Sequence, residues 1–196
     1  MLSVICPIYN EAKYIDVCVQ SILLQDYPKQ QLEVLFVDGM SKDGTRDIVN
    51  NYSKQYPFIR LLNNEKRIVP VAMNIGIKAS IGDIVMRLDA HAQYPPNYFS
   101  VLVKELVRLR ADNVGVACKT DVLNKTSKTL AIREVLSNRF GVGNSTFRLG
   151  VDKVIEVDTV PFGCWKKDVF NKYGFYDERL IRNQDIELNK RIVRGG

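Results

Sequence analysis

Short apolar segments of strand character alternate with segments of helical periodicity, and this alternation constrains the fold more than any other feature of the chain. Apolar runs stand at residues 2–8, 32–37, 59–62 and 83–88. Each run is followed by a stretch in which apolar residues recur every three or four positions, first at residues 11–25. Alternating β and α units of this kind predict an α/β fold, with a mostly parallel central sheet covered by helices on both faces.

The regular alternation ends after residue 119. Residues 124–158 are more polar and carry the run GVGNS at 141–145, so we expect a helix and a mobile loop there. Neither an internal repeat nor a low-complexity tract nor a linker interrupts the 196 residues. A chain of this length fits one domain and buries roughly 70% of its unfolded surface.

Composition excludes several classes of protein. Hydrophobic residues make up 46% and charged residues 26%, as in ordinary soluble domains. The balance of 28 Lys and Arg against 22 Asp and Glu favours phosphate-bearing ligands or an anionic membrane surface, although a solvated basic surface without a specific partner explains it equally well. Basic clusters interleaved with aromatic residues are absent from the sequence, which disfavours nucleic acid as a partner.

Cysteine usage and the N-terminus indicate a cytoplasmic chain. The four cysteines are widely spaced without a CxxC pair, so we interpret them as small buried hydrophobes in a reducing compartment: Cys6, Cys18, Cys118 and Cys164. The first apolar run is too short for a signal peptide, and no run approaches the 18 apolar residues of a membrane span. This expectation leaves room for a membrane segment elsewhere in a longer parent protein.

Polar residues follow the predicted strands at the edge where parallel sheets bind ligands. Asp38 ends the second run and precedes a glycine-rich turn, so its carboxylate could accept hydrogen bonds from a base or ribose. Alternatively, Asp43 and Thr45 cap the next helix while Asp38 organises the turn. The chain lacks both the GxGxxG and the GxxxxGK[ST] phosphate-binding signatures.

Asp89 and His91 flank one residue at the end of the fourth run, so both can face one ion. A carboxylate oxygen and an imidazole nitrogen suit Mn²⁺ or Mg²⁺. His91 is the only histidine, and a lone histidine is more often structural, but its position two residues after a strand-end aspartate favours a ligand role. The ligand count excludes a closed zinc site.

Asp185 is predicted in the first turn of the last helix, whose apolar residues Leu188 and Ile192 lie one turn apart. The helix dipole favours an ionised carboxylate at this position. Two interpretations stay open at this point, a chemical role for the carboxylate and a plain acidic residue that serves only the dipole.

Taken together, these segments resemble the family 2 glycosyltransferases with the GT-A fold, and the likeness runs over residues 2–195 in the family's order. Within the family, the chain is most similar to the succinoglycan-type exopolysaccharide glucosyltransferases of bacteria. The segments that carry the likeness are SVICPIYNE (3–11), VDGMSKDGT (37–45), RIVP (67–70), AMNIG (72–76), ASIGD (79–83), RLDAHAQYPP (87–96), FGVGNS (140–145), GFYDE (174–178) and RNQD (182–185).

The resemblance implies a Rossmann-like GT-A fold and one catalytic domain over residues 1–196, truncated at its C-terminus relative to a longer parent. It implies a hexosyltransferase that moves a sugar, with inversion, from a UDP-sugar to a glycan or a lipid-diphosphate-linked acceptor during exopolysaccharide synthesis. The implied location is the cytoplasm, with peripheral association at the inner membrane through parts that this chain lacks. It leaves the oligomeric state open.

The resemblance also assigns residues to roles. A divalent cation, Mn²⁺ or Mg²⁺, would lie on Asp89 and His91, and Asp185 would be the catalytic base that accepts the proton of the acceptor hydroxyl. Two departures weaken the match: His91 replaces the second aspartate of the usual DxD motif, and Met73 stands where many relatives carry arginine. The implied nucleotide-sugar-binding residues are Pro7, Tyr9, Glu11, Asp38, Arg67, Asn74 and Asp89.

Three rival functions are considered beside this one. A sugar-phosphate nucleotidyltransferase would carry an early glycine-rich signature with a basic residue, which the sequence lacks. A non-catalytic nucleotide-sugar-binding protein would not need Asp89 and Asp185 together, and a donor-hydrolysis assay separates it from an enzyme. A nucleic-acid-binding module is a distant third, testable by the salt dependence of binding.

Overall fold

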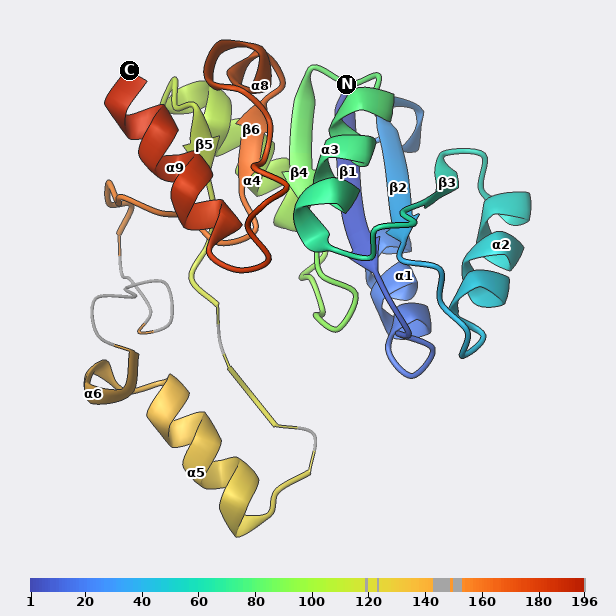
Figure 1. Cartoon of the computed structure of the whole chain (residues 1–196), viewed down its shortest axis with the longest axis horizontal. Helices are drawn as coiled ribbons and strands as arrows, with labels where there is room; N and C mark the ends of the chain where they lie inside the picture. The colour runs from blue at the N-terminus through green and yellow to red at the C-terminus, as the bar shows by residue number, and fades with distance from the viewer. Residues whose placement is uncertain (119, 123, 143–148, 150–152, 196) are drawn as a thin grey trace.

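The computed structural model describes residues 1–118, 120–122, 124–142, 149 and 153–195. A six-stranded sheet in the order β3-β2-β1-β4-β6-β5 forms its centre (Figure 1). The first four strands are parallel, and β6 pairs antiparallel with both β4 and β5. This confirms the predicted mostly parallel sheet. The strands are β1 (Leu2–Ile8), β2 (Leu32–Asp38), β3 (Ile59–Asn63), β4 (Ile84–Arg87), β5 (Asn113–Val114) and β6 (Cys164–Lys166).

Helices cover both faces of the sheet, as predicted. One apolar cluster joins one face to α1, α2 and α4, and a second joins the opposite face to α3, α8 and α9. The helices are α1 (Ile15–Leu23), α2 (Thr45–Gln55), α3 (Val69–Ala79), α4 (Tyr98–Arg108), α5 (Ser127–Leu136), α6 (Arg139–Val142), α8 (Asp168–Tyr173) and α9 (Gln184–Gly195), with a short 3-10 helix η1 (Lys29–Gln31).

The strand β2 shows why its sequence is a continuous apolar run. Val34 and Phe36 pack into one cluster, whereas Leu35 and Val37 pack into the other. Successive side chains of a strand point to opposite faces, so a strand with a helix layer on each side needs apolar residues at every position.

Helix α1 begins at Ile15, later than the predicted segment that starts at residue 11. The intervening backbone is bound to the loop after β2. The amide of Asn10 donates to Ser41 Oγ (2.8 Å), that of Glu11 to Thr45 Oγ1 (2.8 Å), and that of Ala12 to Asp43 Oδ2 (3.0 Å). These contacts hold the two strand-end loops together.

The second half contains elements that the periodicity did not predict. Strands β5 and β6 have two and three residues and helix α8 has six, too few for a repeating pattern to emerge. The predicted helix within 124–158 is present as α5, which stands away from the sheet with α6 (Figure 1). The predicted mobile loop falls largely on residues 143–148 and 150–152, outside the described residues.

The predicted burial of the cysteines holds for three of them: Cys6, Cys18 and Cys164 are buried, whereas Cys118 is partly exposed. Among the residues that the structure describes, no helix combines the length and the apolar character that crossing a bilayer requires.

Candidate active site

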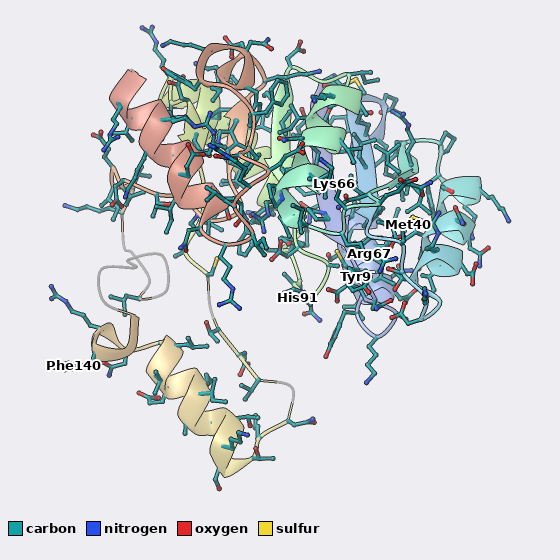
Figure 2. The ribbon with its side chains drawn as sticks, viewed as in Figure 1. Tyr9, Met40, Lys66, Arg67, His91 and Phe140 are labelled. Carbon is teal, nitrogen blue, oxygen red and sulfur yellow. The ribbon has the colours of Figure 1, made fainter. Side chains whose placement is uncertain are left out.

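The carboxyl ends of the four parallel strands meet at one edge of the sheet. Ile8 lies beside Asp38, Asp38 beside Asn63, and Arg87 beside Ile5. The loops that follow these strands enclose a pocket of about 170 Å³. Its lining includes six of the residues predicted to bind nucleotide, sugar or metal: Pro7, Tyr9, Glu11, Arg67, Asp89 and His91. Figure 2 shows Tyr9, Arg67 and His91 on this side of the molecule.

Glu11, Asp89 and His91 converge in this pocket. His91 Nε2 lies 3.9 Å from Asp89 Oδ2, and its Nδ1 lies 3.4 Å from Glu11 Oε1. A histidine that ligates a metal through one ring nitrogen usually donates its other N–H to a carboxylate, which orients the ring. Glu11 therefore stands where it would orient His91 with Nε2 towards Asp89.

Asp89 and His91 fit a divalent cation whose remaining coordination positions are filled by the substrate and by water. Within the described residues, Asp89 and His91 are not joined by a third side chain into a complete metal-binding group. Mg²⁺ and its analogues keep several waters and are often held by one or two protein ligands plus phosphate oxygens. One carboxylate oxygen and one imidazole nitrogen at this spacing meet that requirement.

Tyr94 fixes the backbone at Asp89. The amide of Asp89 donates to the Tyr94 hydroxyl (2.8 Å), and the hydroxyl donates to the Asp89 carbonyl (3.0 Å). Burial raises the pKa of Tyr94, so its hydroxyl stays protonated and keeps both hydrogen bonds. These two hydrogen bonds fix the backbone from which the Asp89 carboxylate extends into the pocket.

Arg87 joins the two aspartates of the predicted mechanism. Its Nη1 donates to both carboxylate oxygens of Asp185, at 2.8 and 2.7 Å, and its Nη2 lies 3.3 Å from Asp89 Oδ1. Burial lowers the pKa of Arg87, but the adjacent Asp185 and Asp89 carboxylates outweigh this effect and raise it. The guanidinium is therefore charged and holds β4 and the start of α9 together.

Asp38 lies beneath the pocket surface and organises the adjoining turn. Its side chain is fully buried, and its carboxylate accepts from the Ser41 amide (3.0 Å), the Ser41 hydroxyl (2.5 Å) and Arg46 Nη1 (2.6 Å). These are the contacts expected of the alternative role considered for this residue, in which Asp38 shapes the turn. Asp43 likewise accepts from Thr45 at the start of α2.

Asn74 also lies outside the pocket lining. Its Nδ2 donates to the Tyr176 carbonyl (3.0 Å) and to Glu178 Oε1 (3.1 Å), and its Oδ1 accepts from the Tyr176 amide (3.0 Å). The side chain thus binds the segment before α9 to helix α3. Arg67, in contrast, is exposed at the pocket, where its guanidinium is accessible to an anionic ligand.

Several non-glycine residues of the surrounding loops adopt left-handed backbone conformations. Such residues are uncommon and tend to gather at functional sites, where the surrounding structure holds them in place. Five of the six described examples lie on loops that carry or contact the residues above: Asn10, Met40, Arg67, Phe162 and Asn183.

A larger cavity of about 650 Å³ lies elsewhere, between α4, α9 and residues 154–160. Its lining is mainly apolar, and the charged side chains among its described lining residues are all acidic: Glu105, Asp112, Glu156 and Asp158. A diphosphate would be repelled there, so the smaller pocket at the strand ends is the better candidate for an anionic ligand.

Comparison with known proteins matches residues 3–174 to the family model described as glycosyl transferase family 2. This match covers most of the chain and includes the loops after all four parallel strands. The chain belongs to glycosyl transferase family 2. The family resemblance inferred from the motifs is therefore confirmed.

Two curated relatives of this family 2 chain are each 30% identical to it. One is a dolichyl N-acetyl-α-D-glucosaminyl phosphate 3-β-D-2,3-diacetamido-2,3-dideoxy-β-D-glucuronosyltransferase of Methanococcus voltae, aligned with 100% of the chain and 62% of its own length. The other is the succinoglycan biosynthesis protein ExoA of Rhizobium meliloti, aligned with 98% of the chain and 58% of its own length. The chain thus spans about three fifths of the length of these relatives.

Solved structures of similar fold confirm the GT-A architecture. The mannosyltransferase PcManGT of Pyrobaculum calidifontis, solved with GDP-Man and Mn²⁺, has a TM-score of 0.73 and 23% identity, over 99% of this chain and 52% of its own. TarS 1-349 of S. aureus, solved with UDP, has a TM-score of 0.69 and 20% identity, over 96% of this chain and 53% of its own.

Sequence reasoning assigned no role to Arg87 or Tyr94 in this family 2 site. Both stand within the motif RLDAHAQYPP, in which only the aspartate and the histidine were interpreted, as metal ligands. The available signal was a charged residue at the end of a strand that is otherwise apolar, because a buried guanidinium needs carboxylate partners. The sequence could not identify Asp185 as one of these partners, since it is 98 positions away.

Proposed function

We propose that this chain is the catalytic domain of an inverting hexosyltransferase that uses a UDP-sugar and a divalent cation, Mn²⁺ or Mg²⁺. The acceptor is a hydroxyl of a glycan or of a lipid-diphosphate-linked sugar, in the synthesis of an exopolysaccharide or another surface polysaccharide. The observation that carries the proposal is the joint placement of Asp89 and Asp185 on one buried arginine, Arg87, beside the strand-end pocket.

Donor binding is assigned to the pocket residues. Tyr9 is 48% exposed and its ring lies against Gly39, so it offers an aromatic face to the nucleobase at the mouth of the pocket. Arg67 supplies an exposed guanidinium for the diphosphate. Asp38 contributes through the shape of its turn, and Asn74 through the segment that precedes α9. When bound at Asp89 and His91, the cation supplies charge neutralisation for the leaving diphosphate.

Transfer follows direct displacement. The acceptor oxygen forms a bond to the anomeric carbon while the bond from that carbon to the diphosphate oxygen breaks, and the electron pair leaves with the diphosphate. The acceptor proton passes to the Asp185 carboxylate, whose side chain is 27% exposed and therefore accessible. Attack opposite the leaving group inverts the anomeric centre.

The metal and nucleotide assignments are tested together by calorimetric titration of the purified protein with UDP. We expect binding in the presence of Mn²⁺ and its loss both in EDTA and in the variant Asp89→Ala. The exposed α8 residue Asp168 provides a matched control, and Asp168→Ala should bind UDP as the unchanged protein does. Equal UDP affinity with Mn²⁺ and with EDTA would show that the metal assignment is wrong.

A further inference from the structure

Arg87 is the charged end of a strand that is otherwise apolar, IVMR at 84–87. Its side chain is only 8% exposed, and a buried guanidinium is costly unless carboxylates compensate its charge. The compensating carboxylates are Asp185 and Asp89, and the Phe162 ring lies 5.4 Å from the guanidinium carbon. The Arg87 guanidinium is therefore enclosed from several sides.

A role in stability alone accounts poorly for this arrangement. A well-packed apolar side chain would fill such a position at equal or lower free-energy cost than a buried ion pair. The pairing is also incomplete, since Arg87 Nε is buried and has no hydrogen-bond partner among the described residues. Both carboxylates that Arg87 holds are those to which the proposed reaction assigns chemistry.

The geometry of the guanidinium suits the joining of two carboxylates on different elements. Its planar fork directs Nη1 to the first turn of α9 and Nη2 to the residue that follows Leu88. A lysine ammonium is a single point charge on a flexible stem and cannot reproduce this geometry. The positive charge between Asp89 and Asp185 also offsets the repulsion between two carboxylates that must approach the same substrate.

We propose that Arg87 is a positioning residue for the transfer reaction. It holds the Asp185 carboxylate in register with Asp89, and so fixes the base relative to the diphosphate end of the site. This inference rests on the proposed function, because it concerns the same reaction. It adds a requirement for arginine at position 87, which neither the pocket nor the family match assigns.

The first test compares Arg87→Lys with the unchanged protein. Binding of UDP with Mn²⁺ measures donor affinity, and hydrolysis of UDP-glucose, in which water is the acceptor, measures turnover. Arg87 itself lines the pocket, but lysine keeps a positive charge there and Asp89 is unchanged, so we expect UDP affinity and the KM for UDP-glucose to stay within about threefold. Misplacing a catalytic group by about 1 Å can cost 10²-fold, so kcat should fall at least tenfold.

A matched control is available on the surface. Arg108 pairs bidentately with Glu105 on α4, away from the site, and Arg108→Lys should leave affinity and kcat unchanged. Because Arg87 is proposed to act through Asp185, hydrolysis by the double variant Arg87→Lys/Asp185→Asn should be no slower than that by Asp185→Asn alone. Independent losses that multiply would overturn the proposal, as would a kcat of Arg87→Lys within twofold of the unchanged protein.

A second test needs no nucleotide. Melting temperatures are measured for Arg87→Gln, Asp185→Asn and the double variant. We expect the melting temperature of the double variant to fall by less than the sum of the decreases in the two single variants. Asp185→Asn deprives the buried Arg87 of its closest carboxylate and Arg87→Gln leaves the Asp185 charge unpaired, whereas the double change removes both charges of this pair. Additive effects would overturn the proposed coupling of Arg87 to Asp185. Absence of UDP binding by the unchanged protein would instead overturn the proposed function, whatever the melting temperatures show.

Discussion

At the scale of single residues, the pairing of Asp185 with Arg87 links the stability of the fold to the proposed chemistry. The carboxylate lies in the first turn of α9, where the helix dipole favours a negative charge, and it also accepts two hydrogen bonds from Arg87. The local geometry is therefore compatible with both the dipole interpretation and the chemical interpretation. They differ in what an uncharged side chain of the same shape should do.

We predict that Asp185→Asn separates stability from turnover. UDP affinity with Mn²⁺ should change little, since the base contacts the acceptor, whereas sugar transfer should fall by about 10²–10⁴-fold. The fold should lose about 1–3 kcal/mol of unfolding free energy, because the buried Arg87 loses the closer of its two carboxylate partners. Urea unfolding, calorimetry and a transfer assay on one preparation measure the three quantities.

A matched control for this prediction is Asp168→Asn, because Asp168 also lies in the first turn of a helix, α8, but is exposed and away from the pocket. It should leave turnover unchanged. Transfer by Asp185→Asn at the rate of the unchanged protein would contradict the assignment of the base. Loss of UDP binding would instead place Asp185 at the nucleotide.

At the scale of elements, the site depends on how the segment before α9 is fastened to α3. Asn74 binds both backbone groups of Tyr176 and the carboxylate of Glu178. Tyr176 itself packs in the apolar cluster with Trp165 and Phe170. The position of α9, and with it Asp185, therefore follows from contacts made well before the helix begins.

We predict that Asn74→Ala lowers the unfolding free energy by about 1–3 kcal/mol, because the buried amide and carbonyl of Tyr176 lose their partner. Turnover should fall while UDP affinity with Mn²⁺ is retained, since Asn74 lies outside the pocket lining. Asn51→Ala, at an exposed position of α2, is the control and should change neither. A loss of UDP binding without loss of stability would return Asn74 to the nucleotide site.

At the scale of the whole molecule, two parts differ in how they are packed. One is the sheet with its two helix layers, and the other is the helix pair α5 and α6, which stands away from the sheet (Figure 1). The sheet lies between two apolar clusters. Helix α5 has no buried residue, and Phe140 of α6 is fully exposed. The stability of the molecule should therefore come from the sheet and its helices.

We predict that two phenylalanine truncations separate these parts. Phe140→Ala should change the unfolding free energy by less than about 0.5 kcal/mol, as is usual for surface positions. Phe170→Ala should cost about 3–5 kcal/mol, because Phe170 is 1% exposed and packs against Trp165 and Tyr176. Urea denaturation followed by tryptophan fluorescence measures both, and equal losses would contradict the division.

Much of this architecture could be predicted from local sequence patterns. A buried parallel strand requires an unbroken apolar run and an amphipathic helix a regular spacing, so the first four strands and the first four helices are recognisable one by one. The motif after the fourth strand singled out Asp89 and His91, and the start of the last helix singled out Asp185, because strand ends and helix starts are where polar side chains can meet a ligand. Their roles stay predictions. The short elements β5, β6 and α8 of the second half escaped, since no period repeats within them.

Contacts between distant residues were decided only by the tertiary structure. The sequence places Asp38 and Asn74 beside binding motifs, yet the fold engages their side chains with Ser41, Arg46 and Tyr176. Likewise, Arg87 acquires its partner only when α9 packs against the sheet and brings Asp185 to it. Periodicity reports which face of an element is buried, but which side chains a buried charge meets depends on elements that are remote in the chain.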